Sequence, residues 1–291
     1  MADGQTVFLN GQLLPIDQAK ISPLDRGFLF GDGGYELIPV YSRRPFRLAE
    51  HLTRLQRTLD GIRLANPYDD ATWTRHITAL IAASPDEDQS IYLQVTRGAD
   101  VKRDHAFPSA DVPATVFMMS SRLATPTPAQ RAAGGAAITV VDNRWLRCDL
   151  KVLALLPNVL LRQQALDAGG VEAILLRDGF LTEGAASNIF LVKEGTLLAP
   201  PKSHLLLPGV TYDVVLELAA RHGLPCVVRE IEEPELRGAD EVWMTSSTRE
   251  VFPITRLDGV PVGDGRPGPV GEQMYAWYQA FKNDVMRRAD G

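Results

Sequence analysis

The chain has 291 residues, of which 45% are hydrophobic and 23% are charged. These proportions exclude extended disorder and are typical of a globular protein with one large or two ordinary domains. The net charge of −6 disfavours general attraction to nucleic acid or to anionic membranes. The longest apolar stretch, 152–161, is about half the length that a bilayer needs, so we expect no membrane partner. Two distant cysteines and the lack of a signal pattern indicate a cytoplasmic protein.

The first 120 residues show a mixture of strand and helix patterns. Residues 6–15 predict a hairpin, because Asn10-Gly11 stands between two apolar runs. Apolar residues recur at helical spacing over 48–62, which predicts an amphipathic helix there. The other elements that we expect in this part are strands at 35–40, 90–96 and 114–119 and a helix at 72–83.

Pro, Ser and Thr are frequent over 120–129, which is the composition of a linker. We therefore predict a small domain at 1–120, a linker at 121–133 and a larger domain at 134–291. Hairpins mixed with helices favour two α+β domains over an alternating doubly wound sheet. The larger domain is expected to contain strands at 136–141, 172–176, 189–192, 196–199, 226–231, 241–244 and 251–257, and helices at 158–168, from about 211 to 223, and at 270–288.

Lys151 is the residue that most clearly indicates chemistry. It lies between the stretch 144–150, which contains a tryptophan and two arginines, and the apolar run 152–156. Partial burial lowers the pKa of an ammonium towards the neutral amine, which can form a Schiff base. The structural alternative is a lysine at the edge of the core whose ammonium only reaches out to water.

Two segments of the larger domain could hold an anion. Residues 207–211 (Leu-Pro-Gly-Val-Thr) lead into a helix, where free N–H groups favour phosphate, and residues 245–248 (Thr-Ser-Ser-Thr) offer four hydroxyls. Arg54 could supply positive charge. Each feature has an ordinary explanation in turn chemistry, capping or solvation. Together with Lys151, they indicate an aldehyde cofactor that carries a phosphate.

Five segments together resemble the fold-type IV pyridoxal-phosphate enzymes. They are 30–36 (Phe-Gly-Asp-Gly-Gly-Tyr-Glu), 50–55, 144–151, 182–188 and 207–211, in one consistent order. Within that family the chain most resembles the D-amino-acid transaminases. The resemblance implies a two-domain α+β fold with a small N-terminal α/β domain and a larger C-terminal domain with a β-barrel-like sheet. It also implies that pyridoxal 5'-phosphate binds at the domain interface.

The resemblance assigns cofactor roles by position. Lys151 would form the Schiff base and move the proton during the reaction. Glu183, which by sequence alone is an ordinary turn residue, would keep the pyridine nitrogen protonated. Arg144 would lie near the cofactor O3', unless it forms a structural ion pair with Asp142 or Asp149. The other implied cofactor contacts, mostly to the phosphate, are Arg54, Leu207, Val210, Thr211, Ser246 and Ser247.

Tyr35, Arg103 and His105 correspond to residues that bind the substrate carboxylate in the D-amino-acid transaminases. A guanidinium holds a carboxylate through two hydrogen bonds, and imidazole and phenol add directed donors. The ordinary alternative is a solvated loop with internal charge pairing. In the family this loop comes from the neighbouring subunit, so the resemblance implies a homodimer. The histidines show no metal-ligand spacing, and we expect no metal.

Several positions depart from the D-amino-acid transaminase pattern and leave the substrate range open. The stretch 98–103 is longer, and Gly34 replaces a branched apolar residue, which would widen the pocket. Ala185 and Ala186 replace serines, and Tyr212 replaces an arginine. None of these changes affects Lys151.

The sequence therefore predicts a homodimeric aminotransferase that acts by a ping-pong mechanism. Its substrates would be D-amino acids, such as D-alanine or D-glutamate, and 2-oxo acids, such as 2-oxoglutarate or pyruvate. The alternatives within the same fold are an L-branched-chain aminotransferase, an (R)-selective amine transaminase and an aminodeoxychorismate lyase. A non-catalytic ligand-binding protein is the alternative from another class.

Overall fold

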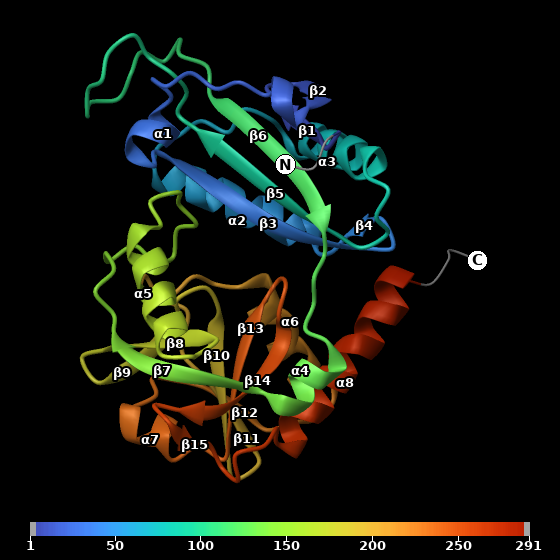
Figure 1. Ribbon diagram of the computed structural model, residues 1–291, viewed down its shortest axis with the longest axis vertical. Helices are drawn as coiled ribbons and strands as arrows, with labels where there is room; N and C mark the ends of the chain where they lie inside the picture. The colour runs from blue at the N-terminus through green and yellow to red at the C-terminus, as the bar shows by residue number, and fades with distance from the viewer. Residues whose placement is uncertain (1–3, 288–291) are drawn as a thin grey trace. The chain divides into compact units, whose positions relative to one another are not determined.

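The computed structural model describes residues 4–287, which belong to two compact units (Figure 1). Unit 1 comprises Met1–Leu123 and Leu150–Leu155, and unit 2 comprises Ala124–Asp149 and Leu156–Gly291. This division differs from the sequence-based one, which placed all of residues 134–291 in one domain. Lys151 belongs to unit 1 because its segment forms backbone hydrogen bonds with a strand of that unit.

Among the described residues, unit 1 is built on a six-stranded antiparallel sheet in the order β2-β1-β6-β5-β3-β4. Helices α2 and α3 cover one face of this sheet, and their apolar side chains form one core with it. The elements of unit 1 are β1 (Thr6–Leu9), β2 (Gln12–Pro15), η1 (Ile16–Gln18), α1 (Arg26–Phe30), β3 (Gly33–Tyr41), β4 (Arg44–Pro45), α2 (Leu48–Gly61), α3 (Asp70–Ala83), β5 (Gln89–Thr96) and β6 (Thr115–Arg122).

Local sequence explains these elements. Asn10 and Gly11 adopt φ angles of 47° and 91°, the left-handed conformation that the tight turn of the predicted β1–β2 hairpin needs. The predicted helix at 48–62 is α2, which places Leu52, Leu55 and Leu59 in the core. The short helix α1, which contains a glycine, was not predicted.

Segment 150–155 lies along the edge of β3 near the start of that strand. The N–H of Tyr35 donates to the carbonyl of Lys151 at 2.9 Å, and the N–H of Leu153 donates to the carbonyl of Gly33 at 3.0 Å. The N–H of Lys151 donates to the hydroxyl of Thr58 on α2 at 3.1 Å. These hydrogen bonds fix the backbone of the lysine between the sheet and the helix.

The described part of unit 2 contains a nine-stranded mixed sheet. Strand β7 pairs in parallel with both β8 and β14, and strand β11 pairs in parallel with β12. Helix α5 packs on β7 and β8, and helices α6 and α8 pack on each other and on β13. The elements of unit 2 are α4 (Pro128–Ala133), β7 (Gly135–Val141), α5 (Leu156–Asp167), β8 (Glu172–Arg177), β9 (Phe180–Gly184), β10 (Asn188–Lys193), β11 (Thr196–Ala199), α6 (Val210–Arg221), β12 (Cys226–Val228), α7 (Glu233–Arg237), β13 (Glu241–Ser246), β14 (Glu250–Leu257), β15 (Val260–Pro261), α8 (Pro269–Lys282) and a π-helical turn (Asn283–Arg287).

The predicted α+β class is confirmed, and most predicted strands and helices are present. Helix α4 lies within the stretch that the sequence analysis assigned to a linker. It forms there because Thr127 and Gln130 make a capping box and Pro128 occupies the first turn. The helix predicted at 270–288 has its last residue outside the described range. Within residues 4–287, no helix is both long and apolar enough to cross a bilayer.

Candidate active site

Lys151 and Tyr35 lie side by side in unit 1. The Nζ atom of Lys151 is 4.1 Å from the centroid of the Tyr35 ring, and both side chains are half-buried. An ammonium over an aromatic face gains a cation–π attraction. The Tyr35 ring also lies 5.8 Å from the ring of Tyr92 on β5. The backbone of Lys151 is therefore fixed by hydrogen bonds and its ammonium by the Tyr35 ring, while part of the side chain stays exposed to solvent.

Glu36 lies next to Tyr35 in sequence but points to the other face of β3, towards α2. Its carboxylate accepts hydrogen bonds from Arg54 Nε and Nη2, both at 2.7 Å, and contacts His51 Nδ1 at 2.8 Å. Glu36 and His51 are fully buried. Arg54, predicted to bind phosphate, is thus already joined to a carboxylate through a two-point ion pair.

The charges of this cluster follow from its contacts. Burial alone would raise the pKa of Glu36, but Arg54 and His51 bring it well below the ordinary range of a glutamate. Burial lowers the pKa of His51 below its usual value, and the neighbouring Glu36 offsets this only in part. We infer an ionised Glu36, a charged Arg54 and a neutral His51 that donates from Nδ1. Within residues 4–287, the Nε2 atom of His51 has no hydrogen-bond partner.

In unit 2, the Glu183 carboxylate is buried at the end of β9. One of its oxygens accepts from Arg144 Nη1 at 2.6 Å, and the other accepts from the backbone N–H of Leu207 at 3.0 Å and from Asn188 Nδ2 at 3.3 Å. Burial raises the pKa of Glu183 to about 7, although Arg144 acts in the opposite direction. The negative charge of Asp142 adds to the increase. This carboxyl group can therefore exchange a proton near neutral pH.

Arg144 connects two acidic side chains. Its Nε and Nη2 atoms donate to the two carboxylate oxygens of Asp142, each at 2.9 Å, while Nη1 binds Glu183. Arg177 also approaches Asp142 at 3.1 Å and donates to the backbone carbonyl of Arg144 at 2.9 Å. The ion pair with Asp142 that the sequence offered as an alternative is present, and it orients the arginine towards Glu183.

The start of α6 has the features of an anion site. Its N-cap residue is Gly209, and within the described chain no side chain of the N-cap accepts a hydrogen bond there. The backbone N–H groups of Val210 and Thr211, in the first turn, are therefore left to bind an anion. A Cβ atom at Gly209 would clash with Oδ1 of Asn188, so a larger residue there would displace the Asn188 amide. Asn188 Nδ2 also donates to the carbonyl of Leu207 at 2.9 Å. The same asparagine thus connects Glu183 to the segment that begins the helix.

Ser246 and Ser247 lie at the end of β13 and in the turn that follows. Both are half-buried, and the Ser246 hydroxyl oxygen accepts from the N–H of Arg249 at 3.2 Å. This bond closes the turn and leaves the hydroxyl hydrogen of Ser246 to donate elsewhere.

Arg103 and His105 are exposed on the loop between β5 and β6. The Arg103 guanidinium lies 5.0 Å from the centroid of the Phe30 ring, and the His105 ring lies 5.3 Å from the same centroid. No ion pair joins Arg103 to a carboxylate within the part of the chain that is described, so the internal charge pairing considered as the alternative is not observed.

Three residues that shape these sites had no role predicted from the sequence, namely Glu36, His51 and Asn188. The spacing of His51 and Arg54, three residues apart on one helix, could have indicated a shared partner. The expectation that Gly34 widens a pocket is not supported, because a Cβ atom there would meet Thr58 at 2.9 Å.

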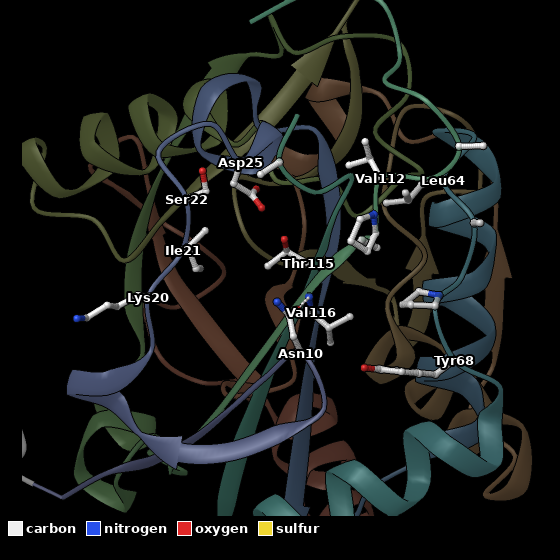
Figure 2. A pocket seen from close by; sticks show the side chains of 16 residues that line it. Asn10, Lys20, Ile21, Ser22, Asp25, Leu64, Tyr68, Val112, Thr115 and Val116 are labelled. Atoms are coloured by element: carbon white, nitrogen blue, oxygen red, sulfur yellow. Dashed lines mark hydrogen bonds between the residues drawn. The ribbon is translucent and has the colours of Figure 1, made fainter. Parts of the chain in front are cut away.

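A separate cavity of about 720 Å³ lies on unit 1 (Figure 2). Two of its polar side chains are engaged within the protein. Asp25 accepts from the N–H of Gly27 at 2.8 Å and from the Thr96 hydroxyl at 3.0 Å, and Asn10 accepts from the N–H of Val116 at 2.8 Å. In addition, residues 4–287 contain no cluster of three His, Cys, Asp or Glu side chains arranged for a metal.

Comparison with known proteins decides the family. Residues 33–257, most of the chain, match the family described as amino-transferase class IV. The chain is a class IV aminotransferase. The predicted family and enzyme class are thereby confirmed, and members of this family are pyridoxal-phosphate enzymes that act on amino acids and 2-oxo acids.

Individual relatives of this class IV aminotransferase span nearly its whole length. It is 37% identical over 272 residues to the D-alanine aminotransferase of Listeria innocua, covering 94% of both chains. It is 37% identical over 280 residues to that of Bacillus licheniformis, covering 96% of this chain and 97% of the relative. The crystal structure of the Escherichia coli branched-chain amino acid aminotransferase has a TM-score of 0.88 and 25% identity, and the match covers 97% of this chain and 95% of that one.

Proposed function

We propose that this class IV aminotransferase transfers the amino group of a D-amino acid, such as D-alanine or D-glutamate, to a 2-oxo acid, such as 2-oxoglutarate or pyruvate. The observation that carries the proposal is the 37% identity over 94–96% of the chain to enzymes named D-alanine aminotransferases. The loop with Arg103 and His105 supports it, since both side chains are exposed donors suited to a carboxylate.

The chemistry of the residues fits pyridoxal phosphate as the cofactor. When bound, this cofactor supplies a conjugated pyridine ring that withdraws electrons from the substrate Cα. The Lys151 amine, half-exposed beside Tyr35, would bind the cofactor aldehyde. The uncapped N–H groups of Val210 and Thr211, the hydroxyls of Ser246 and Ser247, and the charge of Arg54 would hold the phosphate, and Leu207 would pack nearby.

Two side chains would handle protons. Lys151 would take the proton from the substrate Cα and deliver it to C4' of the cofactor, as a positioned general base and acid. Glu183, whose pKa is raised to about 7 by burial, would share a proton with the pyridine nitrogen. Arg144, itself held by Asp142, would fix the orientation of the Glu183 carboxylate. Tyr35 would direct the Lys151 amine and add a donor for the substrate carboxylate.

The proposal includes a homodimer in which Arg103 and His105 complete the site of the neighbouring subunit. Large apolar side chains near this loop are exposed, including Phe28 at 77% and Val101 at 85%. Exposed apolar residues of this size are common at protein interfaces. A second copy of the chain that covers them would bury this surface.

A spectroscopic experiment tests the activity. Purified protein incubated with pyridoxal phosphate should become yellow and should be bleached by D-alanine but not by L-leucine. Lys151→Ala should lose transamination by roughly 10⁴-fold, whereas Lys193→Ala, an exposed lysine of unit 2, should retain it. Bleaching by L-leucine alone would instead establish a branched-chain aminotransferase. A protein that stays colourless would rule out the enzymatic proposal.

A further inference from the structure

Helix α1 holds the backbone of the loop that carries Arg103 and His105. Arg26, the first residue of this helix, is 4% exposed. Its Nη1 atom donates to the carbonyls of Asp104 at 2.6 Å and Ala106 at 3.1 Å, and its Nη2 atom donates to the carbonyl of His105 at 3.3 Å. One guanidinium therefore binds three successive carbonyls of an otherwise exposed loop.

Arg26 is itself fixed by a buried ionic network. Its Nε atom donates to Asp32 at 2.8 Å, and Arg97 donates to the two oxygens of Asp32 at 2.9 and 3.0 Å. Arg97 also donates to the carbonyls of Arg63 at 2.8 Å and Ile62 at 2.7 Å, at the end of α2. Burial would raise the pKa of Asp32, but the two arginines lower it, so the carboxylate stays charged. The position of Arg26 is thus determined by the sheet and α2.

The last residue of α1 contacts the side chains of the same loop. The Phe30 ring has the guanidinium of Arg26 at 4.8 Å and that of Arg103 at 5.0 Å from its centroid. The His105 ring lies 5.3 Å away and is tilted by 42°. An aromatic face attracts each cation. Phe30 therefore contacts the side chains of Arg103 and His105, while Arg26 binds the backbone carbonyls of His105 and of its two neighbours.

We infer that Arg26 and Phe30 are positioning residues that set the affinity of this enzyme for the substrate carboxylate. The inference rests on the proposed function, in which Arg103 and His105 bind that carboxylate. A free loop would have to become ordered each time substrate binds, which weakens binding. Anchoring by α1 removes that cost without any contact between α1 and the substrate. This helix would then act on KM rather than on the proton transfers at Lys151.

Steady-state kinetics of the holoenzyme provide the first test. Arg26→Gln and Phe30→Leu should each raise KM for D-alanine about tenfold, because charged hydrogen bonds and cation–π contacts are lost, with kcat within about twofold. Phe30→Tyr keeps the ring and should restore KM to nearly the wild-type value. Lys102→Gln is the matched control, since this exposed lysine of the same loop makes no side-chain hydrogen bond, ion pair or ring contact within residues 4–287.

Hydrogen–deuterium exchange provides a readout that does not depend on activity. Peptides covering residues 99–107 should exchange faster in Arg26→Gln than in the wild type or in Lys102→Gln. Unchanged exchange together with unchanged KM in both Arg26→Gln and Phe30→Leu would overturn the inference. If the wild type does not turn over D-alanine, the proposed substrate fails. In that case the exchange measurement still decides whether α1 holds the loop. If Arg26→Gln does not fold, the same measurement is made on Phe30→Leu and Phe30→Tyr.

Discussion

Glu36 in unit 1 and Glu183 in unit 2 are both buried and both paired with an arginine, yet their pKa values move in opposite directions. Glu36 receives two hydrogen bonds from Arg54 and a third from His51, and its pKa falls well below the ordinary range. Glu183 receives only one from Arg144, and its pKa rises to about 7.

The difference lies in how the arginine is shared. Arg54 directs two donors at Glu36, whereas Arg144 directs two donors at Asp142 and one at Glu183. Asp142 also repels a negative charge on Glu183. Each carboxylate accepts three hydrogen bonds and burial opposes ionisation in both places, so the number of guanidinium donors and the neighbouring charge decide the direction of the pKa shift. One glutamate is a permanent structural anion, and the other can hold a proton.

Removing the charge of Glu36 should have the largest effect. We expect Glu36→Gln to lower the free energy of unfolding by about 3–5 kcal/mol, because Arg54, whose side chain is only 10% exposed, loses its carboxylate. Urea unfolding of the apoprotein at pH 7 measures this change. Glu50→Gln, on the same helix as Arg54 but exposed, should change stability by less than about 0.5 kcal/mol. Equal effects of the two substitutions would contradict the assignment of Glu36 as a structural anion.

The raised pKa of Glu183 predicts a pH-dependent difference in stability. An acid whose pKa is higher in the folded state than in the unfolded state loses its stabilising contribution as pH rises from the unfolded value, 4.5, to about 7. Relative to the wild-type apoprotein, the free energy of unfolding of Glu183→Gln should therefore increase by about 3 kcal/mol between pH 4.5 and pH 8. The same urea experiment at several pH values measures it. A difference that does not vary with pH would show that Glu183 does not titrate there.

Asn188→Ala should have the smallest effect of the three. The substitution removes a donor to Glu183 and leaves the carbonyl of Leu207 without its amide partner. We expect the free energy of unfolding to fall by about 1–2 kcal/mol. The pH dependence of stability should also move to higher pH, because a donor that stabilises the Glu183 carboxylate is gone. Unchanged unfolding curves at pH 5 and pH 8 would mean that the amide contributes nothing to the state of Glu183.

Local sequence signals were sufficient for much of the fold. The Asn10-Gly11 turn and the periodicity of α2 specify their elements directly, because neighbouring residues supply the decisive contacts. Helix α1 could not be found in this way, since five residues with an internal glycine show no helical period. Its first turn depends on the Asp25 side chain, which accepts from the N–H of Gly27.

The candidate site was predictable only in part. Lys151 and Glu183 belong to motifs that are contiguous in sequence, and these motifs indicated the family. The partners of those residues depend on segments far apart in the chain. Arg26 binds carbonyls 78 to 80 positions away, and Arg144 binds Glu183 across 39 positions. No spacing rule covers such contacts, because the sheets determine which segments meet.

The segment around Lys151 has a consequence for synthesis on the ribosome. Residues 1–123 leave the ribosome first, but the strand edge at Gly33 and Tyr35 gains its backbone partners only when residues 151–153 emerge, after 124–149. Until then, that edge is an unpaired template to which another nascent chain can add. The arrival of the lysine segment therefore closes an aggregation-prone edge and brings Lys151 into unit 1 in a single step.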